Sequence, residues 1–348
     1  MSENIGLFNR IDQTVAPAVR GLEFRGFNGE SDYANILACI HAGKDEDGNE
    51  RSDTLEDVAR YYAHLYNCDP YQDMIFAEVD GKVVGYTRVM WNLSGEGLWL
   101  GFQISFLMPE WRRKGIGRAL LSFDEERLRE IAAHMIETGE LDPETPCFFE
   151  AFINDGEIER EALLIQGGYE AVRHAYNMVR SLSEPILPAP LPEGLEIRAS
   201  LPESYRQIWD ASQEAFRDHW GYFPAPEEEY QKWINDTTFN PDLWQVAWDG
   251  DQVAGMVLNF LNPIENKEYN RKRGYTEGIS VCRPWRRRGL ARALLTRSLQ
   301  MFRDMGMEEA ALGVDTQNLS GALRLYESVG FRPVAHFTTY RKPLDDSR

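Results

Sequence analysis

The chain has 348 residues, of which 43% are hydrophobic and 27% are charged, and its formal net charge is −19 at pH 7. This is about twice the usual domain length, so we expect two hydrophobic cores. The negative charge argues against nucleic acid as a partner and favours a cationic small molecule such as an amine, although acidity alone also maintains solubility.

The sequence shows no sign of a membrane span, a signal peptide or a metal site. Its N-terminus, MSENIGLFNRIDQTV, lacks both a basic region and an apolar core, and charges interrupt the longest apolar stretches. The four cysteines (Cys39, Cys68, Cys147 and Cys282) have no close spacing. We therefore expect a cytoplasmic protein with reduced thiols, no metal and no membrane partner.

Three short sequences recur in the same order in the two halves of the chain. Their offsets are 173, 170 and 174 residues, and the pairs are 21–25 (GLEFR) with 194–198 (GLEIR), 80–85 (DGKVVG) with 249–255 (DGDQVAG), and 112–117 (RRKGIG) with 286–291 (RRRGLA). Matched elements at nearly one offset indicate a tandem duplication.

The duplication predicts two domains joined by a linker. Residues 181–193 contain four prolines, which favour an extended path and exclude a helix. We therefore predict an N-terminal domain at 1–180, a linker at 181–193 and a C-terminal domain at 194–348.

The predicted elements of the second copy include both strands and helices. The first copy has a strand at 102–108 that leads into the basic turn at 112–117. In the second copy, Asp-Gly at 249–250 favours a hairpin turn, and Gly306 is a typical helix end. The predicted strands are 195–199, 275–282, 309–314 and 333–341, and the predicted helices are 202–217, 226–235, 287–305 and 318–329. This pattern predicts α/β domains with a mixed sheet.

The turn at 286–291 is a candidate anion site. It follows a strand and opens a helix, so free backbone N–H groups and the positive end of the helix dipole point to one place, which suits a pyrophosphate. Alone, an arginine run is more often a solvated face or a nucleic-acid patch. A third glycine, as in dinucleotide-binding turns, and Gly-Lys-Ser/Thr, as in P-loops, are both absent.

A second motif follows at 318–331 (NLSGALRLYESVGF), a helical pattern that ends at Gly330. The combination of a strand, Arg-x-x-Gly-x-Ala, and then Asn-x-x-Ala-x-x-x-Tyr-x-x-x-Gly-Phe resembles the GNAT superfamily of acyl-CoA N-acyltransferases. Both copies resemble it. The resemblance implies two tandem GNAT-like domains, each with a mixed, mostly antiparallel central sheet flanked by helices.

The resemblance also implies which residues bind acetyl-CoA, the acyl donor. In the second copy these are Val281, Arg286, Arg287, Arg288, Gly289, Leu290, Ala291 and Asn318. In the first copy they are Arg112, Arg113, Lys114, Gly115, Ile116 and Gly117. Asn318 has an alternative role as the cap of the helix that follows it.

The catalytic candidates are Tyr326 and Glu277. By its motif position, Tyr326 would protonate the departing thiolate; the alternative is a buried aromatic with a satisfied hydroxyl. Glu277, on the strand before the turn, is a candidate general base. The alternative is an exposed strand glutamate or an ion-pair partner of Arg271 or Arg273. His219, in an aromatic-rich loop, is a weaker second base candidate.

The first copy departs from this pattern. Its second block, residues 154–169, has Leu164 or Ala162 opposite Tyr326, depending on the alignment. Aligning the two basic turns places Gln103 opposite Glu277. We therefore predict a first copy that binds CoA at most and catalyses poorly.

The leading hypothesis is an acetyl-CoA-dependent N-acetyltransferase that acts on the primary amine of a small molecule in its C-terminal domain. The alternative is a non-catalytic acyl-CoA sensor. Nucleic-acid binding through residues 271–273 and 286–288 conflicts with the net charge. The acceptor's identity, the acyl chain length and the oligomeric state do not follow from the sequence.

Overall fold

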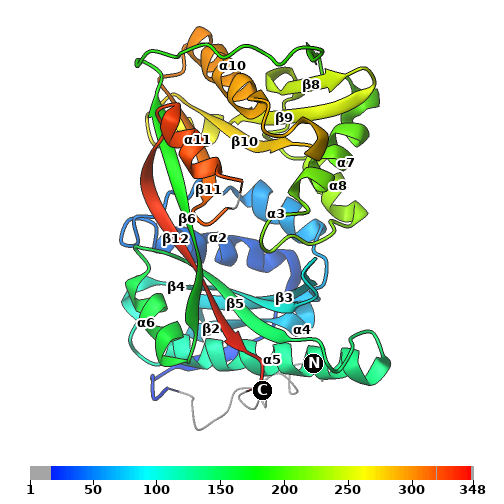
Figure 1. Cartoon of the computed structure of the whole chain (residues 1–348). Helices are drawn as coiled ribbons and strands as arrows, with labels where there is room; N and C mark the ends of the chain where they lie inside the picture. Colours follow the sequence, from blue (N-terminus) through cyan, green and yellow to red (C-terminus); the bar gives the residue numbers. More distant parts are fainter. Residues whose placement is uncertain (1–16, 319, 346–348) are drawn as a thin grey trace. The chain divides into compact units, whose positions relative to one another are not determined.

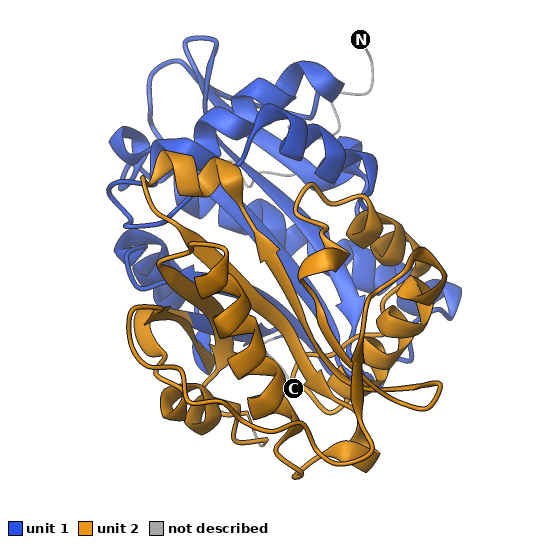
Figure 2. Ribbon diagram, turned by 90° about the horizontal axis from the view of Figure 1, so that it is seen from above, with its two compact units in different colours: residues 1–172, 338–348 blue, residues 173–337 orange. Residues whose placement is uncertain are grey.

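The computed structural model describes residues 17–318 and 320–345, and these form two compact units. Unit 1 comprises residues 1–172 and 338–348, and unit 2 comprises residues 173–337 (Figure 2). Within the described ranges, no helix has the length and apolar character needed to cross a membrane.

Unit 1 contains a mixed sheet with helices on both faces (Figure 1). Its strand order is β1-β2-β3-β4-β5, followed by the end of β12. Among β1 to β5, the pair β4–β5 is parallel and the other neighbouring pairs are antiparallel. The strands are β1 (Leu22–Arg25), β2 (Met74–Val79), β3 (Lys82–Leu93), β4 (Trp99–Leu107) and β5 (Cys147–Asn154). The helices are α2 (Tyr33–Ala42), α3 (Leu55–Ala63), α4 (Pro70–Asp73), α5 (Ile116–Thr138) and α6 (Ile158–Gln166).

Unit 2 repeats this arrangement. Its strand order is β7-β8-β9-β10-β11, followed by β6, and β10 and β11 form the parallel pair. The strands are β6 (Glu170–Ser181), β7 (Glu196–Arg198), β8 (Gln245–Asp249), β9 (Gln252–Leu261), β10 (Arg273–Val281), β11 (Glu309–Asp315) and β12 (Arg332–Pro343). The helices are α7 (Tyr205–Phe216), α8 (Glu227–Ile234), α9 (Pro263–Glu268), α10 (Leu290–Asp304) and α11 (Ala322–Ser328). Short 3₁₀ turns precede α2, α5, α7, β8 and α10. The mixed, mostly antiparallel sheet with flanking helices is the predicted fold class.

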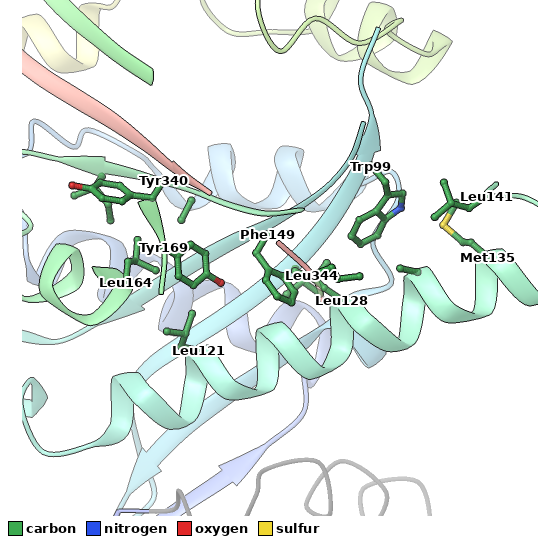
Figure 3. Packing of buried hydrophobic residues seen from close by; sticks show 14 residues of the cluster. Trp99, Leu121, Leu128, Met135, Leu141, Phe149, Leu164, Tyr169, Tyr340 and Leu344 are labelled. Carbon is green, nitrogen blue, oxygen red and sulfur yellow. The ribbon is translucent and has the colours of Figure 1, made fainter. Parts of the chain in front are cut away.

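The period-two alternation of the strands explains why helices cover both faces. On β2, Ile75 and Ala77 pack with α5, whereas Met74 and Phe76 pack with α2 and α3. Figure 3 shows the larger core of unit 1, where Leu128 of α5 lies with Phe149 of β5. The core of unit 2 is built in the same way around α10 and α11.

The chain passes from unit 1 to unit 2 inside β6 and returns inside β12. The last strand of the first repeat therefore belongs mainly to the sheet of unit 2, where β6 pairs antiparallel with β11 from Ala175–Asp315 to Ser181–Glu309. Beyond β12, the Leu344 N–H donates to the Cys147 carbonyl of β5 in unit 1. The boundaries 1–180, 181–193 and 194–348 remain a prediction about the repeat, whereas the compact units exchange their last strands.

Each unit contains a parallel pair that separates after a few residues. β10 and β11 pair only over Arg273–Tyr275 and Glu309–Ala311, and β4 and β5 pair only over Trp99–Phe102 and Cys147–Glu150. Beyond these residues the two strands of each pair have no ladder pairing, so each sheet opens toward its basic turn.

Candidate active site

The two basic turns have the same backbone conformation. Arg287 and Gly289 have φ of 62° and 83°, and their counterparts Arg113 and Gly115 have φ of 58° and 88°. α10 and α5 then begin without a side-chain cap. Because the first-turn N–H groups have no intrahelical partner, each turn presents several donors to an anion.

The first arginine of each turn shapes the turn. Arg286 donates to the Val281 carbonyl at 3.0 Å and the Ala215 carbonyl at 3.0 Å, and it pairs with Asp218 at 2.8 Å. Arg112 likewise donates to the Leu107 carbonyl at 3.3 Å and pairs with Asp47 through two contacts of 2.6 Å. The sequence analysis did not identify these two aspartates, although they lie 171 residues apart, close to the repeat offset.

The other residues predicted to bind the anion in the turn of unit 2 differ in exposure. Arg287, Arg288 and Gly289 are exposed, and Arg288 donates to the Glu193 carbonyl at 3.0 Å. Leu290 is buried in the core, and Ala291 is half-buried in the first turn of α10.

Glu277 lies beside a β-bulge in β10. The pairing of β10 with β9 shifts by one residue between Glu277 and Ser280, and Gly278 has φ of 56°. The Gly313 N–H of β11 donates to the Glu277 carboxylate at 3.0 Å. Burial raises the pKa of Glu277 to about 7, and this hydrogen bond opposes the shift. The predicted partners Arg271 and Arg273 pair instead with Glu265 and Glu309.

Tyr326 lies on α11 with an exposed fraction of 6% and packs against Phe331 and residues of β11. Burial raises the pKa of Tyr326, and the negative charge of Glu277 raises it further. The hydroxyl therefore keeps its proton at neutral pH and is available as a donor.

The predicted helix at 318–329 begins later than expected. α11 starts at Ala322 with Gly321 as its N-cap, so Asn318 does not cap it, and that alternative was wrong. The Asn318 side chain accepts from the Ser320 N–H at 2.8 Å, and its amide nitrogen lies 3.5 Å from His219 Nε2. Burial lowers the pKa of His219, so its ring is mostly neutral near pH 7.

Unit 1 lacks both candidate catalytic groups. Its β3 and β4 pair without a register shift from Gly85–Leu107 to Leu93–Trp99. Counting from Gly85 and its counterpart Gly255, Ile104 is therefore the structural equivalent of Glu277, and the equivalence with Gln103 was wrong. Leu164, with an exposed fraction of 2%, stands at the place of Tyr326 when the Gly-aromatic ends of the two motifs are aligned.

Unit 1 nevertheless has a cavity of about 510 Å³ at its basic turn. Six cationic and three acidic side chains line it, an excess of positive charge in a strongly acidic chain. The cations are Lys44, Arg51, Arg112, Arg113, Arg118 and Arg160, and the acids are Asp47, Glu157 and Glu159. Apolar residues of α5 and α6 complete the wall, so the cavity suits an anionic ligand with an apolar arm.

Both units therefore combine a separated parallel strand pair with an uncapped helix start, and this arrangement defines a tandem acyl-CoA-dependent acyltransferase. The "Acetyltransferase (GNAT) family" matches residues 205–331, and the "Acetyltransferase (GNAT) domain" matches residues 70–152. The chain belongs to the GNAT acetyltransferases, uses acetyl-CoA as its acyl donor and carries two copies of the domain.

Curated relatives and solved structures resemble the chain over almost its whole length. The mycothiol acetyltransferase of Geodermatophilus obscurus is 28% identical, with 94% of this chain and 99% of the relative covered. The mycothiol acetyltransferase of Salinispora arenicola is 26% identical, with 89% of this chain and 93% of the relative covered. A GCN5-related N-acetyltransferase from Sphaerobacter thermophilus superposes with a TM-score of 0.69 at 24% identity over 94% of this chain and 97% of that chain. A tandem GNAT protein from the clavulanic acid biosynthesis pathway superposes with a TM-score of 0.61 at 14% identity, over 94% of this chain and 100% of that chain.

Proposed function

We propose that unit 2 transfers the acetyl group of acetyl-CoA to the primary amine of a small molecule and that unit 1 binds acyl-CoA without catalysis. One observation carries the proposal. In unit 2 Glu277 lies close enough to Tyr326 for its charge to raise the tyrosine's pKa, whereas Ile104 and Leu164 occupy the equivalent places in unit 1. A cytoplasmic location is part of the same proposal.

The proposed chemistry divides two proton transfers between these groups. The Glu277 carboxylate accepts a proton from the acceptor ammonium, and the amine nitrogen then attacks the thioester carbonyl carbon. When the carbon–sulfur bond breaks, the Tyr326 hydroxyl gives its proton to the departing thiolate. The attacking nitrogen then loses its second proton, which restores the Tyr326 hydroxyl, and Glu277 releases its proton to solvent. The products are the N-acetylated amine and free CoA.

The cavity of unit 1 supports its role as an acyl-CoA site. Its cationic rim and apolar wall match the phosphates and pantetheine arm of CoA. The curated relatives are named mycothiol acetyltransferases, which makes a mycothiol-related, thiol-bearing amine a candidate acceptor. Aminothiols therefore belong in the acceptor panel beside simple amines.

Calorimetric titration with acetyl-CoA tests which unit binds. Gly117 and Ala291 are equivalent first-turn residues of α5 and α10, and neither has positive φ, so Gly117→Glu and Ala291→Glu each place a carboxylate at one anion site. We expect two sites in the wild type, each removed by one variant. Gly117→Gln and Ala291→Gln are controls of the same size without charge, and retention of both sites in both glutamate variants would contradict the assignment.

Turnover tests the acceptor class. Wild-type protein, acetyl-CoA and a panel of glucosamine, tyramine, spermidine and 2-aminoethanethiol should give free CoA, measured chromatographically because aminothiols react with thiol reagents. We expect Ala291→Glu to abolish this release and Gly117→Glu to retain it. Absence of CoA release with every amine would overturn the proposed acceptor class.

A further inference from the structure

One face of the strand pair β6–β11 in unit 2 lies open beside Glu277. In the register of this pair, Asn177 stands directly opposite Gly313, and Ala175 stands opposite Asp315. Asn177 and Gly313 are both exposed, whereas the alternate residues Met178, Leu312 and Val314 are buried in the core. The outward face at this point therefore carries one amide side chain beside a position without a side chain.

The missing side chain of Gly313 leaves a small volume on which two oxygen atoms converge. A Cβ atom at Gly313 would lie 3.8 Å from Glu277 Oε1 and 3.9 Å from Asn177 Oδ1. Glu277 belongs to β10 and Asn177 to β6, so the two groups approach this volume from the two strands that flank β11. A carboxylate and an amide carbonyl are both hydrogen-bond acceptors, which suits a donor-rich cation.

The charges on this face also favour a cation beside Glu277. Two other carboxylates lie on this face of β11: Asp315 pairs with Arg173 through contacts of 2.9 and 2.6 Å, and Glu309 pairs with Arg273 at 2.7 Å. In residues 17–318 and 320–345, the structure gives Glu277 no ion pair. The unneutralised acceptor on the face is therefore the Glu277 carboxylate next to Gly313.

We propose that the acceptor ammonium of the acetyl transfer is held over Gly313, between the Glu277 carboxylate and the side-chain carbonyl of Asn177. The inference rests on the proposed function of unit 2 and makes Asn177 a positioning residue for it. An ammonium has three N–H donors, so it satisfies both oxygens and keeps one donor for a third group. Asn177 lies in the first sequence repeat, so the site of the second copy is completed by a strand of the first.

Gly313→Ala tests the volume itself. The backbone of Gly313 lies outside the positive-φ region, and the new methyl group would make only ordinary van der Waals contacts, so the fold should tolerate it. The methyl group would occupy the space assigned to the ammonium. We expect the acceptor KM to rise about tenfold or more, with acetyl-CoA affinity unchanged.

Two substitutions at Asn177 test the amide. Asn177→Leu removes the acceptor and should raise the acceptor KM about tenfold with little change in kcat at saturation. Asn177→Asp restores an acceptor and adds a charge beside Glu277, so KM should return toward the wild-type value and the acid limb of kcat/KM should move to higher pH. Ser181→Leu is the control, because Ser181 is exposed on the same face of β6, about 13 Å further along the strand.

The experiment separates this inference from the proposed function. Turnover of a panel amine with wild-type KM in both Gly313→Ala and Asn177→Leu would overturn the inference alone, whereas no turnover by the wild type would overturn the acceptor class. A carbon-13 titration of the Glu277 carboxyl in Asn177→Asp needs no acceptor. It should show that carboxyl titrating at higher pH than in the wild type, and an unchanged midpoint would refute the shared site.

Discussion

Replacing Glu277 with glutamine should remove both the base and the pH dependence of the reaction. With a pKa of about 7, the wild-type carboxylate is about one-tenth ionised at pH 6 and about nine-tenths ionised at pH 8. Because the ionised form is the active one, wild-type kcat/KM should rise about tenfold between these two pH values. Glu277→Gln keeps the side-chain size but accepts no proton, so kcat/KM should fall about 10²- to 10⁴-fold and become independent of pH in this range.

The assay is initial-rate release of CoA from pH 5.5 to 9, with acetyl-CoA affinity measured by calorimetry for each variant. Glu308→Gln is the matched control, since Glu308 is an exposed glutamate of the same unit that pairs with Lys272. If the Glu277→Gln enzyme is slower but its kcat/KM still rises from pH 6 to pH 8, this acid limb of the pH profile belongs to another group. His219 is then the candidate, and its limb would lie below the ordinary histidine value because burial lowers its pKa. An unchanged rate and limb would refute the base role.

Three further predictions follow from single side chains. Tyr326→Phe should lower kcat about 10- to 100-fold while calorimetry shows unchanged acetyl-CoA binding, because only the proton donor is lost. Asp124 is fully buried with a pKa raised to about 8, so the folded state holds a proton that the unfolded state releases, and stability falls as the pH rises from about 4 to about 8. Urea unfolding should therefore show Asp124→Asn gaining on the wild type by about 1.4 kcal/mol per pH unit between pH 5 and pH 8, and parallel curves would contradict this. Arg286→Ala should lower Tm because it removes the donor to the Val281 and Ala215 carbonyls and leaves Asp218 with Arg283 as its remaining arginine partner. Arg287→Gln should weaken acetyl-CoA binding at unchanged Tm, because Arg287 is exposed, and the reverse pattern would reassign the two arginines.

Local sequence patterns were sufficient to find most elements of the second copy. The predicted strand at 309–314 and helix at 226–235 lie within a residue of β11 and α8. The helix predicted from 318 starts at Ala322 instead, because Gly321 adopts φ of 78° and ends the preceding turn. Helical periodicity does not distinguish a first helical turn from a polar turn of the same length.

The equivalence of the two sites depended on a feature that the motifs do not record. Aligning the basic turns places Gln103 opposite Glu277, but the bulge at Gly278 adds one residue to β10 and makes Ile104 the equivalent. A bulge depends on pairing with a distant strand, here β9, so spacing within one segment cannot reveal it. Either alignment leaves unit 1 without a carboxylate at this place.

The sequence by itself determined the duplication, the mixed α/β fold, the two basic turns and the candidates Glu277 and Tyr326, because repeats, periodicity and glycine positions are local properties of the chain. Three features follow only from the tertiary structure. β6 of the first repeat pairs with β11, Asp218 forms an ion pair with Arg286, and the side-chain oxygens of Asn177 and Glu277 both lie close to Gly313. The physical reason is that strand pairing and charge pairing join residues many positions apart, and no local pattern specifies which partner a strand edge or an arginine will find.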